Sequence, residues 1–400
     1  MPPSGSDRGA PPPAAPLGIY AHFPFCSVRC TYCDFPTVAG RDDRIEAYLR
    51  ALLEEIASHQ PDARGAADTV FLGGGTPSRM TAAQTARLLE AIAERFDVAD
   101  DAEITLEGNP ESLTADALQG FRHAGVTRIS VGVQSLDDAV LARAGRAHDA
   151  ADARRAVADA RAAGFPDVSV DLIAGLPGED VASWARTVAR VAGWEPDHVS
   201  VYLLESDKET PLGRGVRSGR VRIPDDDALA AMYETTVEAL ERAGYPLYEI
   251  SNFSRSGHRS RHNLKYWTDA PYAGFGLGAH GYVAGERRSN RRDLDGYLSD
   301  LAAGRSPRSW TEAFDRARRL EEALFLGLRV AEGVDLAALA RRYGLDPRTV
   351  YAAAWERAEA AGLIALEEDR VRLTPSGRVR SNELFAELIG DEAPSPARPL

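Results

Sequence analysis

The stretch IYAHFPFCSVRCTYCDF, residues 19–35, passes from an apolar run into a loop that holds all three cysteines of the 400-residue chain. The thiols belong to Cys26, Cys30 and Cys33, so their spacing is C-x3-C-x2-C. Pro24 has no N–H to donate to a strand ladder, so it ends the run and leaves the thiols in the loop. The stretch therefore predicts a strand followed by a loop that can surround one metal centre.

Apolar runs of the same kind recur through the first half of the chain, each followed by a segment with helical periodicity. They predict strands at 17–23, 68–74, 103–109, 128–135, 167–175 and 198–205. Helices are expected near 42–58, 81–95, 114–124, 148–163, 179–193 and 226–244. Strands that read as apolar on both faces and alternate with helices predict a parallel sheet covered by helices, either open or closed into a barrel.

Distinctive groups end each predicted strand. They are His22, the turn 73–76, Glu107 with Asn109, Gln134 with Ser135, Asp171, and residues 202–205. The carboxyl ends of the strands meet at one mouth in a barrel, whereas an open sheet gathers such groups at a switch point. We therefore expect an α/β fold with an incomplete (β/α)6 barrel.

The second half of the chain departs from this alternation. Residues 245–254 read as a seventh extended segment, and 257–297 are rich in glycine and aromatic residues. Beyond Pro307, a helix-turn-helix pattern and the run IALEEDRVRLTPSG predict a winged-helix-like module. The expected organisation is a disordered tail (1–16), a partial barrel (17–244), a barrel extension with HNLKYW (245–306), a C-terminal helical winged-helix-like module (307–390) and a tail (391–400).

Composition excludes several classes of partner. The net charge of −13 opposes binding to a phosphate backbone, so no nucleic acid partner is expected. The first sixteen residues lack the apolar core of a signal peptide, and no run approaches the roughly 20 apolar residues that span a bilayer. Three clustered cysteines give no disulfide framework, so a reducing, cytoplasmic location is expected.

Three thiols in one loop leave more than one kind of site open. Structural zinc and ferredoxin-type clusters each need four protein ligands, so zinc would require His22 as the fourth. Three unpaired core cysteines are a plainer alternative. A 4Fe-4S cluster held by three thiolates would leave one iron open, and an open metal position is typical of a site that binds something other than protein.

The C-x3-C-x2-C motif, with Tyr32 before its last cysteine, resembles the motif of the radical S-adenosylmethionine (SAM) superfamily. The resemblance implies a 4Fe-4S cluster on Cys26, Cys30 and Cys33 whose open iron is chelated by SAM. The positions that match SAM contacts of the family are Tyr20, Tyr32, Gly74, Gly75, Thr76, Glu107, Gln134, Arg146 and Asp171. The glycine-rich turn FLGGGTPS alone would read equally well as a tight turn.

Further segments narrow the resemblance to the anaerobic coproporphyrinogen oxidase family and, within it, to the branch of HemW-type heme chaperones. They include EGNPE, RISVGVQS, DLIAGLPGE, YEISNFS and GLGAHGY, and the likeness covers residues 17–390. The oxidases of the family carry a fourth cysteine two places after the third, where this chain has Phe35. The resemblance therefore implies a heme chaperone, and the alternative is a radical SAM oxidoreductase, an oxygen-independent coproporphyrinogen III dehydrogenase (decarboxylating).

The implied partners are heme, a reductant and an acceptor protein, for which a membrane-bound cytochrome component is one candidate. Heme needs an axial donor such as histidine and aromatic or apolar walls. The segment SRHNLKYW offers both in His262, Asn263, Tyr266 and Trp267. Lesser candidates are His258 and His280, and the arginines of 286–293 could pair with heme propionates.

Two alternatives to the heme interpretation stay open. His262 and Trp267 could simply close the open side of the barrel, with the imidazole hydrogen-bonded to backbone, and the arginines of 286–293 could be a solvated surface. A zinc-stabilised winged-helix regulator is a third kind of protein, although the acidic charge weighs against it.

Overall fold

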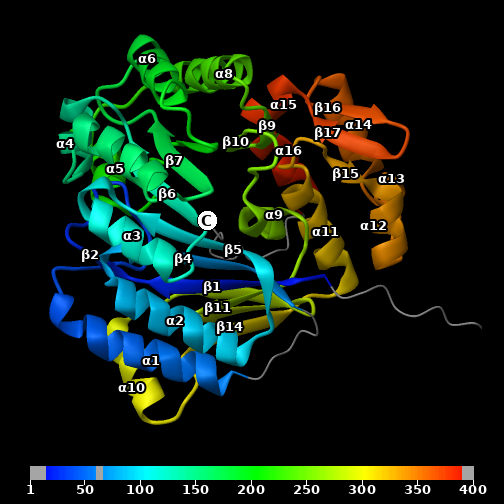
Figure 1. Cartoon of the computed structure of the whole chain (residues 1–400). Helices are drawn as coiled ribbons and strands as arrows, with labels where there is room; N and C mark the ends of the chain where they lie inside the picture. The colour runs from blue at the N-terminus through cyan, green and yellow to red at the C-terminus, as the bar shows by residue number, and fades with distance from the viewer. Residues whose placement is uncertain (1–14, 60–65, 390–400) are drawn as a thin grey trace, which may run out of the picture.

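The computed structural model describes residues 15–59 and 66–389. Six parallel strands follow one another in chain order through the middle of a curved 12-stranded sheet (Figure 1). They are β1 (Leu17–Phe23), β4 (Ala67–Gly74), β5 (Val98–Gly108), β6 (Arg128–Gln134), β7 (Asp167–Ala174) and β8 (His198–Leu203). The predicted α/β fold is confirmed, and the concave side of these strands, with the side chains that point to it, is called the barrel interior below.

Further strands lengthen the sheet at both edges. β11 (Tyr272–Phe275) pairs parallel with β1, and β12 (His280–Val283), β13 (Glu286–Asn290) and β14 (Arg308–Ala313) follow it in antiparallel order. At the other edge, β10 (Asn252–Ser254) and β9 (Leu247–Glu249) replace the single extended segment expected at 245–254. Within the described residues β14 and β9 end the sheet without pairing with each other, so the barrel is incomplete.

Helices on the outer face cover the parallel strands (Figure 1). They are α1 (Ile45–Ser58), α2 (Ala82–Arg95), α3 (Ala115–His123), α5 (Ala150–Ala162), α6 (Val181–Ala192) and α8 (Asp226–Arg242). Two further helices, α4 (Asp138–Ala144) and α7 (Pro211–Arg217), pack in a separate apolar cluster with residues at the ends of β7 and β8. Short elements fill the loops: β2 (Phe25–Cys26), β3 (Val38–Ala39) and the 3-10 turns η1 (Asp42–Arg44), η2 (Pro77–Arg79) and η3 (Pro110–Ser112). α4 and α7 were not expected from the sequence.

The two faces of the parallel strands differ in polarity, which corrects our expectation that both are apolar. Outward side chains such as Ile129 and Val131 of β6 are fully buried in the main hydrophobic core. Inward positions alternate with them, and Ser130 of β6 lies opposite Ser169 of β7. Cross-strand neighbours point to the same side of a sheet, so such pairs form polar rows along the barrel interior.

The C-terminal part has its own hydrophobic core, formed by residues between Leu320 and Leu388. Its helices are α11 (Arg316–Gly327), α12 (Leu336–Tyr343), α13 (Pro347–Val350), α14 (Ala352–Ala360), α15 (Pro375–Val379) and α16 (Ser381–Leu388). A three-stranded sheet of β15 (Val334–Asp335), β17 (Arg370–Leu373) and β16 (Ile364–Glu367) accompanies them. Helices followed by a small hairpin are the arrangement that a winged-helix-like module predicts.

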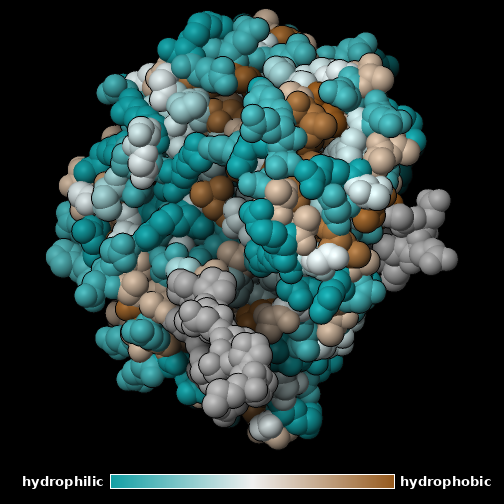
Figure 2. Space-filling model, turned by 90° about the vertical axis from the view of Figure 1, so that its right-hand side faces the viewer, coloured by the Kyte–Doolittle hydropathy of each residue, from teal (hydrophilic) through white to brown (hydrophobic). Residues whose placement is uncertain are grey.

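Hydrophilic residues cover most of the face drawn in Figure 2, with hydrophobic residues in small separate groups. Among residues 15–59 and 66–389, no helix has both the length and the apolar character needed to cross a membrane. The two expected tails lie almost entirely outside the described residues, since these exclude 1–14 and 390–400.

The start of α2 offers a first test of the local structure. The Thr81 hydroxyl accepts a hydrogen bond from Gln84 N at 3.1 Å. The Gln84 side-chain oxygen in turn accepts one from Thr81 N at 2.9 Å, and the two bonds form a capping box. Thr81→Ala is expected to lower the free energy of unfolding by about 1 kcal/mol. Chemical denaturation measures the loss. Ser299→Ala, at an exposed position inside α10 (Leu294–Ala302), serves as the control and should change stability little.

A buried carboxylate in the loop after β7 gives the fold a pH dependence. Glu179 accepts hydrogen bonds from Ser135 Oγ at 2.8 Å and from Gly175 N and Leu176 N at 3.1 Å. Burial raises the pKa of Glu179 from its ordinary 4.5 to about 7, although these donors oppose the shift. A pKa raised in the folded state means that the fold is favoured while Glu179 is protonated. This contribution to the free energy of unfolding is fully present below pH 4.5 and is lost as the pH rises through 7.

We expect the free energy of unfolding to fall between pH 5 and 8, by at most about 3 kcal/mol from this group. The Glu179→Gln protein should show a smaller fall over the same range. Some decline should remain, because burial also raises the pKa of Glu249 to about 7. Denaturation curves of both proteins at pH 5 and pH 8 measure this fall. If the free energy of unfolding falls equally in both, Glu179 does not contribute to the pH dependence.

Candidate functional site

The cysteine loop lies over the carboxyl ends of the parallel strands. β2 pairs parallel with β3, which places Cys26 opposite Ala39 and closes the base of the loop. On the far side, Thr31 N donates to Ala144 O at 3.0 Å and Leu212 N donates to Thr31 O at 2.9 Å. The loop is thus anchored to the end of α4 and the start of α7, at the mouth of the barrel interior.

The three thiols do not all lie within 4.8 Å of one another. Tetrahedral zinc with four ligands at about 2.3 Å would bring the sulfurs to about 3.8 Å from one another. In the described parts of the chain, the only group of three ligand atoms within 4.8 Å of one another lies elsewhere and contains no cysteine. In this structure the three thiols therefore do not all stand as close together as the ligands of one tetrahedral zinc ion.

The proposed fourth zinc ligand is also engaged in other contacts. His22 is buried, its Nδ1 lies 2.9 Å from Tyr20 Oη, and its Nε2 lies 3.2 Å from Pro36 O. Burial lowers the pKa of His22 to about 4, so the ring is neutral at neutral pH. His22 therefore supports the wall of the site through its hydrogen bonds.

Two polar groups contact the thiols. Thr76 Oγ1 donates to Cys26 Sγ at 3.5 Å, and Arg146 Nη1 donates to Cys30 Sγ at 3.6 Å. Burial raises the pKa of Cys26, and it raises that of Cys33 to about 11. Iron binding must therefore displace protons from these thiols, and Arg146 supplies a positive charge beside the resulting thiolates.

The glycine turn after β4 lies directly against the loop. Gly74 has φ +117°, and its N–H donates to Glu107 Oε2 at 2.9 Å. A Cβ on Gly75 would stand 2.5 Å from Pro24 O and 3.0 Å from Cys26 Sγ. Only residues without side chains fit here, so the backbone itself faces the cysteine site.

Arg146 connects the loop to the ends of two strands. Its Nη2 donates to Asn109 Oδ1 at 2.8 Å and to Gly132 O at 2.6 Å. Asn109 Nδ2 in turn donates to Thr76 Oγ1 at 3.3 Å. Asn109, seen in the sequence only as a strand-end group, thus links the contacts of Cys26 and Cys30, and its place after Glu107 at a strand end was the available signal.

Buried polar atoms without partners mark where a ligand would be held. Arg146 Nε and Gln134 Oε1 are both buried and make no hydrogen bond with described residues. Gln134 also has φ 67°, an uncommon conformation for a residue with a side chain. An unpaired buried donor and acceptor beside a glycine cradle fit a ligand with both carboxylate and amino or hydroxyl groups, as SAM has.

The remaining predicted SAM residues line the same mouth at different depths. Tyr32 packs against a small apolar cluster that includes Val140 and Ala144. Tyr20 stacks on Phe71 with ring centroids 6.1 Å apart. Asp171 lies opposite Gly132 and accepts from Ser130 Oγ at 2.7 Å.

The barrel interior contains acidic groups that favour their neutral forms. Burial raises the pKa of Glu107 to about 8 and also raises that of Asp171. Tyr202 of β8 lies close enough to both carboxyl groups, and to Glu249, for their charges to raise its own pKa further. Yet 45% of Tyr202 is exposed, so the interior is open to solvent at this point.

The segment HNLKYW forms α9 (Arg261–Trp267) at the other end of the barrel, near the amino ends of the strands. The Glu103 carboxylate of β5 accepts hydrogen bonds from the Arg261 and His262 N–H groups, both at 3.0 Å. Lys265 Nζ lies 2.6 Å from Asp68 Oδ1. A strand carboxylate therefore caps the helix and fixes it as the floor of the barrel interior.

His262 is fully buried in this floor, and both of its ring nitrogens have partners. Nδ1 lies 2.8 Å from Thr69 Oγ1, Nε2 lies 2.9 Å from Tyr266 Oη, and the ring stacks on Phe71. Burial lowers its pKa to about 3. This geometry favours the interpretation that His262 closes the barrel, with side chains rather than backbone as its partners.

The other members of this segment divide between two surroundings. Tyr266 lies edge-on to Tyr272 with centroids 4.7 Å apart. Trp267 carries the Arg329 guanidinium 4.9 Å above its ring, which joins the floor to the C-terminal part. Asn263 is partly exposed near the start of the helix. The structure therefore does not gather the four predicted heme residues around one open space.

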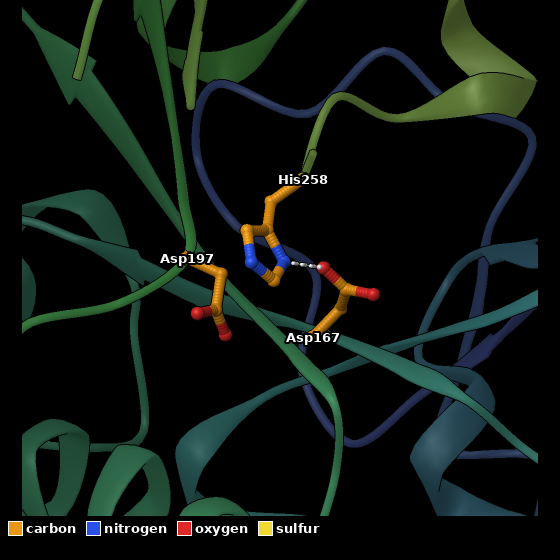
Figure 3. A group of neighbouring side chains, drawn as sticks. All are labelled: Asp167, Asp197 and His258. Carbon is orange, nitrogen blue, oxygen red and sulfur yellow. Dashed lines mark hydrogen bonds and ion pairs between the residues drawn. The ribbon is translucent and has the colours of Figure 1, made fainter. Parts of the chain in front are cut away.

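One other group has the spacing of metal ligands. Asp167, Asp197 and His258 point toward one another near the amino ends of β7 and β8 (Figure 3). Arg161 Nη1 lies 2.5 Å from Asp197 Oδ2, and Arg128 Nη1 lies 3.6 Å from Asp167 Oδ1. These two guanidinium groups already balance the carboxylates, so the group is an ion-pair network of the barrel floor.

The chain is similar to known protein families and to proteins of known name. The profile described as the radical SAM superfamily matches residues 20–191, and that of the HemN C-terminal domain matches residues 314–380. The heme chaperone HemW of Bacillus subtilis is 34% identical over 378 residues, which cover 93% of this chain and 99% of the relative. HemW of Mycobacterium tuberculosis is 39% identical over 390 residues, 95% of this chain and 97% of the relative.

A solved structure shares the fold. That of the Escherichia coli coproporphyrinogen III oxidase HemN, a radical SAM enzyme, superposes with a TM-score of 0.82 at 24% identity, over 94% of this chain and 90% of that one. The likeness includes the C-terminal part as well as the barrel. At this level of identity it describes the architecture alone.

Proposed function

Because the chain belongs to the HemW heme chaperone family of the radical SAM superfamily, we propose that it binds heme and transfers it to an acceptor protein. The observation that carries the proposal is the extent of the likeness. The HemW proteins of Bacillus subtilis and Mycobacterium tuberculosis match more than nine-tenths of this chain and of their own length. We therefore expect this chain to contain every part that the activity of these relatives requires, both the barrel and the C-terminal part.

Cys26, Cys30 and Cys33 would hold the 4Fe-4S cluster that the superfamily carries, because they are three free thiols of one anchored loop at the mouth of the barrel interior. The cluster would supply one-electron chemistry at an iron that no cysteine occupies. Arg146 would neutralise charge at the cluster edge and hold the glycine turn in register through Asn109. A protein reductant would be needed to load the electron.

SAM would lie between the glycine turn and the strand ends. Gly74, Gly75 and Thr76 would bring backbone to the ligand, Tyr32 would border the cluster, and Arg146 with Gln134 would offer the unpaired donor and acceptor. Tyr20, Glu107 and Asp171 would face its other end, deeper in the barrel interior. Glu107, with its pKa near 8, would be protonated at neutral pH and able to donate a hydrogen bond.

Phe35 favours the chaperone over porphyrinogen oxidation. The oxidases that the family resembles have a cysteine at this position, and a partly buried phenyl ring can bind neither metal nor substrate carboxylate. The acceptor would be a protein that matures with heme, and a membrane-bound cytochrome component is one candidate. With a net charge of −13, nucleic acid is not among the proposed partners.

Heme titration tests this function. The full chain, purified anaerobically and reconstituted with iron and sulfide, should develop a Soret band that saturates as hemin is added. When this heme-loaded protein is mixed with an apo-cytochrome, heme should pass to the acceptor, and the Soret band of the chaperone should be replaced by that of the cytochrome. The same preparation should convert no coproporphyrinogen III to protoporphyrinogen IX. Absence of a saturable Soret band would contradict the chaperone, and sustained turnover would support the oxidase instead.

A further inference from the structure

The heme chaperone proposed above needs a side chain that can reach heme iron, and the histidines of the chain can be compared on this point. All eight lie in the described residues. Seven are held by hydrogen bonds, by an acidic partner or by packed rings: His22, His59, His123, His148, His198, His258 and His262. The eighth, His280, is partly exposed and hydrogen-bonds through its imidazole to no residue of the described chain.

His280 is the first residue of β12. Because β12 runs antiparallel to β11, it begins at the end of the sheet where the parallel strands end, at the mouth of the barrel. Gly274 of β11 pairs with Tyr20, whose hydroxyl contacts His22, and a Cβ on Gly274 would meet the backbone of His280. The fold therefore brings the start of β12 close to the strand that supports the cysteine site. Burial and the charges of Arg287 and Arg292 lower the pKa of His280. The ring is therefore neutral at neutral pH and keeps the lone pair that an iron ligand must donate.

An aromatic row leads away from His280 along the same face. Alternate residues of a strand share a face, so His280 and Tyr282 project together. Tyr282 lies 6.5 Å from Tyr272, which in turn lies 4.7 Å from Tyr266 of α9. Tyr272 and Tyr282 are buried, so the row is a continuous packing of rings that links the surroundings of His280 to the predicted heme segment.

Arg292 adds a cation beside the imidazole. Its Nη2 donates to Asp34 O at 3.0 Å, immediately after Cys33, so it lies at the edge of the cysteine loop. The side chain is exposed and forms no ion pair with any residue that the structure describes. A guanidinium without an acidic partner is suited to a heme propionate. Arg287, by contrast, is already bound to Glu322 at 3.0 Å.

We infer that His280 ligates the iron of heme and that Arg292 pairs with a propionate, at the rim of the barrel mouth beside the cysteine loop. This inference rests on the proposed function and names its site. It places the heme next to the proposed cluster instead of on the barrel floor, where His262 is enclosed.

Spectroscopic titration of single variants tests the assignment. His280→Ala is expected to weaken hemin binding by about tenfold or more and to remove the absorption bands of the histidine-ligated form. Added free imidazole should restore those bands, because it can occupy the space of the lost ring. His123→Ala, a histidine on the outer helix α3, should bind hemin like the unchanged protein. Iron content and circular dichroism confirm that each variant is folded.

A second pair of measurements isolates Arg292. Arg292→Ala should weaken binding of hemin but not of hemin dimethyl ester, which has no free carboxylate. Unchanged affinity and bands in a folded His280→Ala protein would overturn the inference, as would loss of the bands in His262→Ala alone. If the unchanged protein binds no hemin, the proposed chaperone function fails, and the inference fails with it.

Discussion

Cys30→Ala protein, reconstituted anaerobically with iron and sulfide, should remain colourless and retain close to no iron. Three thiolates are the fewest that hold a 4Fe-4S cluster with one open iron, so removal of one leaves two irons without a protein ligand. Cys30 is also the thiol that Arg146 contacts, at 3.6 Å. Visible absorption together with iron and sulfide analysis measures the outcome.

His22→Ala is the matched comparison, because it separates a cluster from a zinc site. A site of three cysteines and one histidine would lose its metal in both variants. A cluster on three cysteines would be lost in Cys30→Ala alone, since His22 is hydrogen-bonded to Tyr20 and Pro36. A brown Cys30→Ala protein with unchanged iron content would refute the assignment of Cys30 as a ligand.

Gly75→Ala should weaken SAM binding by about ten- to a hundredfold, the equivalent of about 1–3 kcal/mol. That is the usual cost of forcing an extra carbon into a packed site. The new Cβ would stand 2.5 Å from Pro24 O, an atom of the loop backbone that cannot move without displacing Cys26. Equilibrium binding of SAM to the reconstituted protein, measured by calorimetry, gives the change.

Gly193→Ala provides the control for the glycine substitution. Gly193 directly follows α6, and a Cβ there would come no closer than 3.4 Å to any atom beyond its two chain neighbours, which is ordinary contact. Its SAM affinity should be unchanged. If Gly75→Ala binds SAM as well as Gly193→Ala does, the glycine turn does not contact the ligand.

The order of strands and helices was predictable because each buried run of apolar residues is local in sequence. β1, for example, spans Leu17–Phe23 as expected. The polarity of the barrel interior was present in the same runs, since serine alternates with valine in RISVGVQ and DVSVDLI. Reading these runs as apolar on both faces overlooked that a serine can be buried when a neighbouring strand offers it a partner, as Asp171 does for Ser130.

The candidate site was predictable where a motif is continuous and was missed where it depends on distant contacts. The thiols and the glycine turn each lie within a few residues. The position of α9 depends on Glu103, which lies 158 residues before Arg261 and caps that helix. Whether a histidine is enclosed, as His262 is, or open, as His280 is, depends on such long-range packing, so residue identity alone could not rank the two.

The confinement of every thiol to one loop has a practical consequence for labelling. Once iron occupies Cys26, Cys30 and Cys33, the chain has no further cysteine to react with a maleimide. A cysteine introduced at an exposed position such as Val350 of α13, which is 54% exposed, would then be the sole reactive thiol. A single fluorophore or spin label could be attached there without any background substitution, and distances from the C-terminal part to the paramagnetic cluster would become measurable.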